Sequence, residues 1–263
     1  MEELRSALQE VWPVVIETVE GSARQHWHGW TPCHPWTVAD LVAHVGHAEG
    51  RLIHDFPQPE PPPGWSFEGA LLHQMTNLGV ASRAAWSQDE VVDEAVRAGR
   101  ATLELLADPD VDWERPNLTP VGMGNLATAL EFRLSDLYTH LCDLRVAFGE
   151  DLDPLREPIA AAGLVGRAVR LAGWAMVKQA GLAEGTRLRL DLTGPGAVRT
   201  DVVVVEGRGR LEEPSGTPNG TVAGSGVAYA LTAGGRPDMA ARLGLTITGH
   251  AAEIFLATYK LFG

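Results

Sequence analysis

The sequence is poor in cysteine: 263 residues contain only Cys33 and Cys142, and these are not in the CxxC spacing of redox or zinc motifs. Two distant cysteines suit a reducing compartment better than a disulfide framework. The N-terminus lacks the basic segment and apolar stretch of a secretion signal, and no uninterrupted apolar run reaches roughly 18 residues. We therefore expect a cytoplasmic protein without a membrane-spanning segment.

Basic residues are also scarce. There are 21 Lys and Arg residues against 34 Asp and Glu, which gives a formal net charge of −13. Such a chain repels phosphate backbones, and it has no run of Lys or Arg that would bind nucleic acid or an anionic membrane. The GxSxG, GxxxxGK[ST] and strand-linked GxGxxG motifs are absent too, so the usual serine-hydrolase, P-loop and dinucleotide-binding classes are excluded.

What is present divides the chain into two unlike parts. Up to about residue 183 the apolar residues recur at intervals of three and four, which is typical of packed helices. From residue 184 onward the pattern alternates with a period of two in "TRLRLDL" and "VRTDVVVVEG", which predicts strands. We expect a two-domain α+β protein, with a helical bundle over 1–183 and a small α+β domain over 184–263.

Start signals locate several helices of the first part. Thr37 and Asp40 form a capping-box pattern, and "SQDE" from Ser87 forms another. Between them we expect a helix over about 68–85, and Asn125 is expected to cap a later helix after a loop over 108–124. A further helix is predicted over about 156–181.

The helix after Asn125 carries a polar line beside its apolar seam. This line comprises Arg133, Asp136, His140 and Asp143. Asp136 and His140 are four residues apart, so both side chains reach one point beside the helix. Buried charges in such a position require partners or a metal ion.

A third ligand has to come from another helix, and His44 is the candidate because it lies on the apolar stripe of the helix that starts after Thr37. Two histidines and one carboxylate with open coordination positions suit catalytic Zn²⁺, Ni²⁺ or Fe²⁺. The ordinary alternatives are an i,i+4 hydrogen-bonded pair on the surface and a buried core histidine. His47 and His54 point away from the direction of His44 and are weaker candidates.

Two elements resemble a known family. "CHPWTVADLVAHVGH" is similar to its WTVxDLVxHL element, and "RLSDLYTHLCDLRVAFG" is similar to its RxxExxxHxxDLxxAxG element. The family is that of the mycothiol-dependent maleylpyruvate isomerases, within the DinB-like metalloenzyme superfamily. The resemblance implies a DinB-like four-helix bundle, a sterol-carrier-like second domain, and a metal bound by His44, Asp136 and His140. Zinc is the usual metal, and Asp136 replaces the commoner Glu.

The resemblance also implies an activity. A metal-activated thiolate of mycothiol would add to a small electrophilic, unsaturated substrate, which makes the protein an isomerase or S-transferase. Arg236 corresponds to an arginine that binds a carboxylate, with Arg242 as an alternative, and Asp143 would orient a ligand or the thiol. The partners would be the thiol and the substrate, and the protein would be a monomer or homodimer. The alternatives are a thiol-independent metalloenzyme of the same fold and a non-catalytic module that binds a small ligand or a metal.

Overall fold

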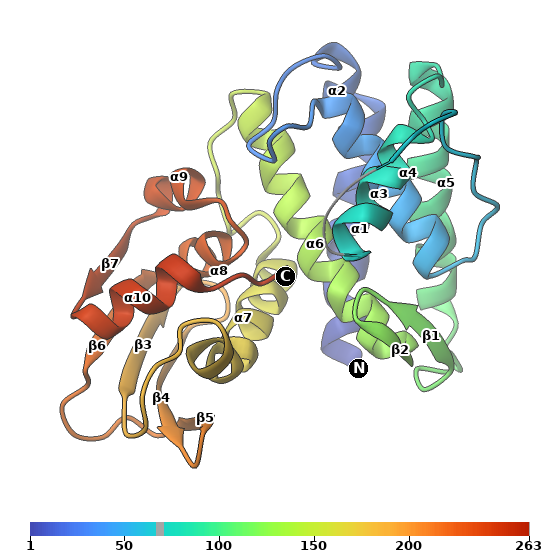
Figure 1. Ribbon diagram of the computed structural model, residues 1–263. Coiled ribbons are helices and arrows are strands. Elements are labelled where there is room, and N and C mark those ends of the chain that lie inside the picture. The colour runs from blue at the N-terminus through green and yellow to red at the C-terminus, as the bar shows by residue number, and fades with distance from the viewer. Residues whose placement is uncertain (67–70, 263) are drawn as a thin grey trace. The chain divides into compact units, whose positions relative to one another are not determined.

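The computed structural model describes residues 1–66 and 71–262, and the chain forms two compact units, Met1–Asp151 and Leu152–Gly263. The first unit is helical, and the second combines helices with a sheet (Figure 1). The expected α+β class, a helical part followed by a small α+β part, is confirmed.

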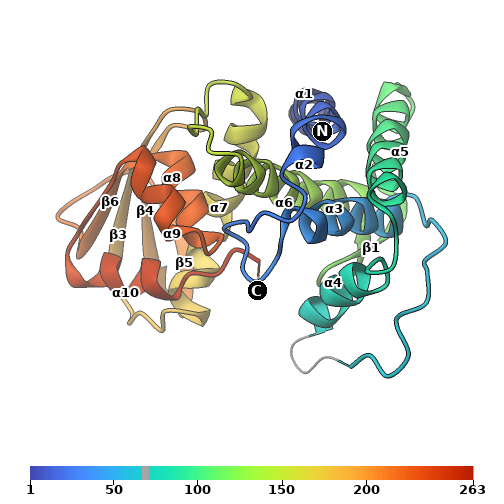
Figure 2. The same ribbon diagram turned by 90° about the horizontal axis from the view of Figure 1, so that it is seen from above.

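Four long helices build the first unit: α1 (Glu2–Glu20), α3 (Val38–Leu52), α5 (Gln88–Ala107) and α6 (Leu126–Ala147). Helix α5 packs against α1 and α3, and α6 also packs against both of them, so the four helices surround one core (Figures 1 and 2). Apolar residues at intervals of three and four fill this core. The largest are Leu8, Trp12, Leu41, Leu106, Leu130, Leu137 and Leu141.

The predicted start signals are confirmed. Thr37 and Asp40 form a reciprocal capping box at α3, and Ser87 and Glu90 form one at α5. Asn125 accepts a hydrogen bond from the Thr128 amide at the start of α6. These caps determine where the helices that carry the polar residues begin.

Shorter elements complete the first unit. Helix α2 (Ser22–Gln25) follows α1, and α4 (Leu71–Ala81) packs against α3. Residues 68–70, at the start of the helix expected over 68–85, lie outside the described residues. The segment expected as a loop over 108–124 contains an antiparallel hairpin of β1 (Pro116–Thr119) and β2 (Gly122–Asn125). The strands are four residues long and lack a strong period-two pattern, so the sequence did not reveal them.

The second unit contains a five-stranded sheet in the order β5-β4-β3-β6-β7. Only the β3–β6 pair is parallel among the described strands. Helices α7, α8 and α10 pack on one face of the sheet (Figure 2). The bounds are α7 Pro158–Lys178, β3 Arg187–Thr193, β4 Val198–Val205, β5 Arg208–Glu212, β6 Gly220–Ser225, α8 Gly226–Ala233, α9 Pro237–Ala240, η1 Ala241–Leu243, β7 Leu245–Thr248 and α10 His250–Thr258.

Helix α7 corrects the expected domain boundary at 183/184. Its sequence is helical, as predicted, but it belongs to the second unit, where it packs against β4, β5 and α8. A Cβ added at Gly173 would lie 2.4 Å from the carbonyl oxygen of Gly209 in β5. Glycine at both positions therefore permits the helix to approach the strand closely. Helical periodicity alone cannot tell which core a helix faces, and this is why the boundary was misplaced.

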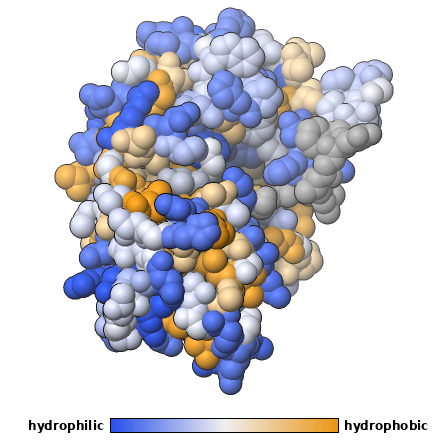
Figure 3. Space-filling model, turned by 60° about the vertical axis from the view of Figure 1, so that its left-hand side comes forward, coloured by the Kyte–Doolittle hydropathy of each residue, from blue (hydrophilic) through white to orange (hydrophobic). Residues whose placement is uncertain are grey.

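Helix α7 is also long and apolar enough to cross a membrane, but most of it is buried within the protein, as expected of a core helix. On the molecular face drawn in Figure 3, hydrophobic residues are interspersed with hydrophilic ones and form no continuous band.

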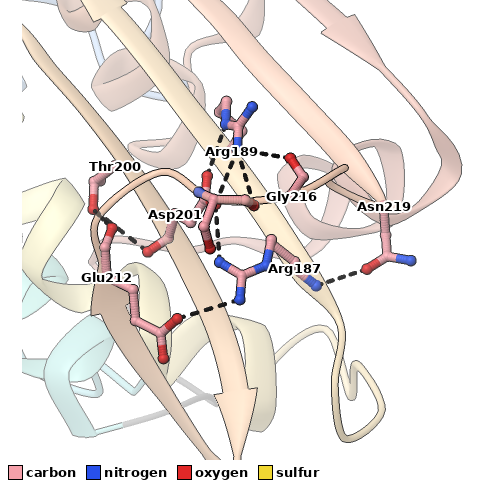
Figure 4. A network of polar contacts seen from close by, with 8 residues as sticks. Arg187, Arg189, Thr200, Asp201, Glu212, Gly216 and Asn219 are labelled. Atoms are coloured by element: carbon pink, nitrogen blue, oxygen red, sulfur yellow. Dashed lines mark hydrogen bonds and ion pairs between the residues drawn. The ribbon is translucent and has the colours of Figure 1, made fainter.

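The face of the sheet opposite the buried leucines of β3 carries a network of charged residues (Figure 4). Asp201 is fully buried at its centre and accepts hydrogen bonds from Arg187, Arg189 and the Ser215 amide. Burial alone would raise the pKa of Asp201, but Arg189, the Ser215 amide and Arg187 lower it to about 2. Arg189 also donates to the Ser215 and Gly216 carbonyls, so the network anchors the segment between β5 and β6.

Candidate metal centre

Helices α3 and α6 bring three of the predicted residues together inside the bundle. One Asp136 oxygen lies 3.1 Å from Nε2 of His44, and its other oxygen lies 3.4 Å from Nε2 of His140. One ligand atom from each of the three residues lies within 4.8 Å of the others. Both histidines are almost completely buried, whereas about a fifth of the Asp136 side chain is exposed, at 21%. The arrangement is thus a buried cluster with one accessible side.

The second ring nitrogen of His140 has a fixed partner. Nδ1 of His140 lies 2.9 Å from an Asp143 oxygen, and Asp143 is fully buried. A carboxylate can only accept, so Nδ1 carries the proton and the neutral ring presents the lone pair of Nε2 to Asp136. Two acceptors then face each other at 3.4 Å. A second proton on the ring or a metal ion removes this repulsion.

Electrostatics couple the three residues. Burial would raise the pKa of Asp136, but His140, His44 and Arg133 hold it well below its usual range. Burial lowers the pKa of His44 more than Asp136 raises it. For His140 burial acts in the same direction, but the nearby Asp136 and Asp143 outweigh it and raise the pKa. An ionised carboxylate between two imidazoles is a donor set that divalent transition metals prefer.

A buried ion pair adjoins this cluster. The Arg133 guanidinium donates to Asp136 through Nη1 at 2.5 Å and to Glu49 of α3 through Nε at 2.9 Å. Asp136, Asp143 and Glu49 together with Arg133 leave two excess negative formal charges, which a divalent cation would neutralise. The residues present therefore fit a divalent metal both in ligand type and in charge.

The loop before α3 covers the cluster. The Trp36 ring lies 4.9 Å from the His44 ring and 6.1 Å from the His140 ring, measured between centroids. Cys33 of the same loop forms a second group with His140 and Asp143 whose ligand atoms lie within 4.8 Å of one another. The sequence did not predict that Cys33 or Trp36 lies near His140, because a loop has no periodicity that would point its side chains toward a helix.

The other candidate residues make separate contacts. Nδ1 of His47 lies 2.7 Å from Gln58 Oε1, and burial lowers the pKa of His47 to about 3. Nε2 of His54 lies 2.8 Å from Thr102 Oγ1. Arg236 belongs to the second unit, where it precedes α9 and donates to the Gly234 carbonyl. Arg242 is exposed in η1.

Sequence reasoning missed Glu49. It is fully buried, with Oε2 bound by Arg133 and Oε1 by the Thr102 hydroxyl. Residues 41 to 50 of α3 are all buried, so the helix is enclosed on every side. A charged residue within such a helix needs a partner, but its complete burial depends on tertiary packing and is not evident from helical spacing.

A four-helix bundle with two histidines and a carboxylate converging from two of its helices defines the class: a helical-bundle protein with a candidate metal centre. The family model described as the mycothiol maleylpyruvate isomerase N-terminal domain matches residues 8–145. The chain belongs to this family, as the sequence resemblance indicated.

Solved structures agree on the fold. The chain is similar to the crystal structure of a mycothiol-dependent maleylpyruvate isomerase, with 18% identity and a TM-score of 0.59. It is equally similar to a histidine-to-alanine mutant of such an isomerase, with 18% identity and a TM-score of 0.60. Each match covers 94% of this chain and 92% of the other. A comparison with curated proteins found no match.

Proposed function

We propose that the protein is a metal-dependent enzyme that uses mycothiol to isomerise, or to conjugate, a small unsaturated electrophile. The observation that carries this proposal is the convergence of His44, Asp136 and His140 within 4.8 Å in the bundle of a protein from this family. Similar solved proteins are described as mycothiol-dependent maleylpyruvate isomerases, which favours isomerisation of a maleylpyruvate-like substrate.

His44, Asp136 and His140 would hold the metal, with zinc as the first choice and nickel or iron as alternatives. When bound, the metal would supply a Lewis acid that lowers the pKa of a thiol below its ordinary value of about 8.5. Three protein ligands leave at least one position for that thiol. The partial exposure of Asp136 supports access from solvent.

The chemistry requires no oxidant or reductant. The thiolate forms a carbon–sulfur bond with one alkene carbon, the former double bond rotates as a single bond, and cleavage of the same carbon–sulfur bond restores the alkene as its other isomer. The thiol is regenerated, so the net change is isomerisation. In an S-transferase the carbon–sulfur bond would persist in the product.

The chain's own residues would orient these partners. Asp143 fixes the orientation of His140 through its bond to Nδ1. Trp36 shields both histidine rings and keeps bulk water from that side. Arg236 is proposed to bind a carboxylate of the substrate or of the thiol. We also propose that the partners are small molecules, that the protein is a monomer or homodimer, and that it is located in the cytoplasm.

Metal analysis and calorimetry test it. Purified protein should contain close to one equivalent of metal and lose it when His140 is replaced by alanine. The metal-loaded protein should bind mycothiol, and incubation with mycothiol and maleylpyruvate should convert the cis to the trans isomer, as followed by NMR.

Each outcome has a separate meaning. Unchanged metal content in His140→Ala would contradict the metal site. If the protein contains the metal but does not bind mycothiol, the thiol-independent metalloenzyme is favoured. If mycothiol binds and the product is a stable conjugate, the S-transferase is favoured.

A further inference from the structure

We propose that Glu49 and Arg133 are positioning residues that fix the carboxylate of Asp136 and set the charge of the metal centre. Neither residue is a ligand in the proposed set. The inference deepens the proposed function and depends on it, because it concerns the same centre. The hydrogen bonds concerned connect α5 through α3 to α6.

The hydrogen bonds to Glu49 have defined directions. The Thr102 hydroxyl donates to Oε1 of Glu49, and Nε of Arg133 donates to Oε2. Both Glu49 oxygens are therefore occupied by donors. Because the Thr102 hydroxyl proton is used in this way, its oxygen accepts from Nε2 of His54.

Arg133 bridges two carboxylates. Its Nε and Nη1 groups point to two different carboxylates, at 2.9 Å to Glu49 and 2.5 Å to Asp136. The guanidinium is planar, so anchoring one edge on Glu49 determines where Nη1 meets Asp136. That bond engages the same Asp136 oxygen that faces His44, and the other oxygen then faces His140. The carboxylate is held in the orientation that presents one oxygen to each imidazole.

The charges of Glu49 and Arg133 also act on the metal centre. Glu49 is fully buried and Arg133 is only 2% exposed, so solvent screens neither charge well. If Glu49 were neutral, Asp136 would be the one charged carboxylate that the described hydrogen bonds give to the Arg133 guanidinium. The guanidinium would then compete with a metal for that carboxylate and repel the metal's charge. Glu49 thus preserves Asp136 as an anionic ligand.

The bundle contains a matched control. Arg83 and Glu94 form a second buried Arg–Glu pair, in which Nε and Nη2 of Arg83 both donate to Glu94. Glu94 is 4% exposed, and no described hydrogen bond or ion pair joins it to His44, Asp136 or His140. Replacing either glutamate with glutamine removes a carboxylate partner from a buried arginine, but only Glu49→Gln alters the surroundings of Asp136.

The experiment measures zinc Kd by competition with a chromophoric chelator, beside urea unfolding, for wild type, Glu49→Gln and Glu94→Gln. We expect both variants to lose stability, because each loses a buried ion pair. We expect Glu49→Gln to raise the zinc Kd roughly 10- to 100-fold, the range for partners that orient metal ligands. Glu94→Gln should leave the Kd within about twofold. Arg133→Lys, which retains the charge but lacks the planar guanidinium that holds both carboxylates in a fixed geometry, should raise the Kd as well.

The outcomes separate the two proposals. If Glu49→Gln binds zinc as tightly as wild type, or if Glu94→Gln weakens binding equally, the positioning role is refuted while the metal site stands. If wild type itself binds neither zinc, nickel nor iron, the metal site and the positioning role fall together. Should Glu49→Gln fail to fold, Thr102→Val removes one donor to Glu49 and should raise the Kd about two- to fivefold, a smaller change than the loss of an orienting partner. An unchanged Kd in that variant would refute the role.

Discussion

Two aspartates, one in each unit, have the same side chain but differ in their surroundings and in their roles. Asp201 accepts only from donors, namely two arginines and a backbone amide, so its hydrogen-bonding needs are met within the sheet. Asp136 accepts from one arginine and lies against two imidazoles, whose nitrogens can bind a metal ion. Both carboxyl pKa values are lowered. A depressed pKa therefore does not distinguish a structural carboxylate from a functional one, whereas the nature of the facing atoms does.

The largest difference should appear in metal binding. Asp136→Asn removes one of three proposed ligands, so the zinc Kd should rise by more than about 100-fold, since orienting partners alone account for 10- to 100-fold. Isomerase activity should be lost with it. Asp201→Asn should leave the Kd unchanged, and chelator competition on the two variants checks both expectations. A similar loss of zinc in Asp201→Asn would remove the distinction.

The loss of stability should follow the opposite order, with Asp201→Asn losing more than Asp136→Asn. Asp201→Asn leaves Arg187 and Arg189 without their shared carboxylate and should lower the free energy of unfolding by about 2–3 kcal/mol. Asp136→Asn should cost less, because Arg133 retains Glu49. Urea unfolding in the presence of a chelator measures both. Equal losses would indicate that the two networks contribute alike.

The response to acid sharpens the same contrast. The folded pKa of Asp201 is about 2, below the ordinary value of 3.8. A carboxyl group with a depressed pKa stabilises the fold fully above its unfolded pKa, and that contribution disappears as the pH falls from about 4 to about 2. After allowance for solvent screening, this contribution to the free energy of unfolding is on the order of 1 kcal/mol. Asp201→Asn should flatten this part of the pH–stability curve, and an unaltered curve would argue against the assignment.

The smallest effect concerns Trp36. Because its ring lies against both histidines, metal binding should change its fluorescence. Trp36→Phe retains an aromatic cover, so the zinc Kd should stay within about threefold, while the zinc-dependent change in emission should largely vanish. A persisting signal would show that another tryptophan reports on the centre.

Much of the helical structure of the first unit can be predicted from local features of the sequence. The caps at Thr37, Ser87 and Asn125 and the recurrence of apolar residues specify where long helices begin and which face is buried. About one helical turn is also enough to place Asp136 beside His140. That His44 meets them depends on how α3 and α6 pack, which the spacing within one helix does not encode.

The parts that the sequence did not reveal are those that depend on tertiary context. The β1–β2 hairpin is too short for a pattern to emerge. Helix α7 approaches β5 closely at Gly173 and Gly209, which are distant in sequence. Glu49 becomes a positioning candidate only once Arg133, 84 residues away in the chain, is seen to reach both carboxylates.

The span between His44 and Asp136 has a consequence for chain entropy. The two residues are 92 positions apart in sequence. A metal ion bound to both would close a loop of that length, much as a disulfide does, and so restrict the unfolded chain. In a protein with only two cysteines, such a metal cross-link would make the melting temperature of the bundle depend on the concentration of free metal. The ion that activates the thiol would then also be the cross-link that stabilises the bundle.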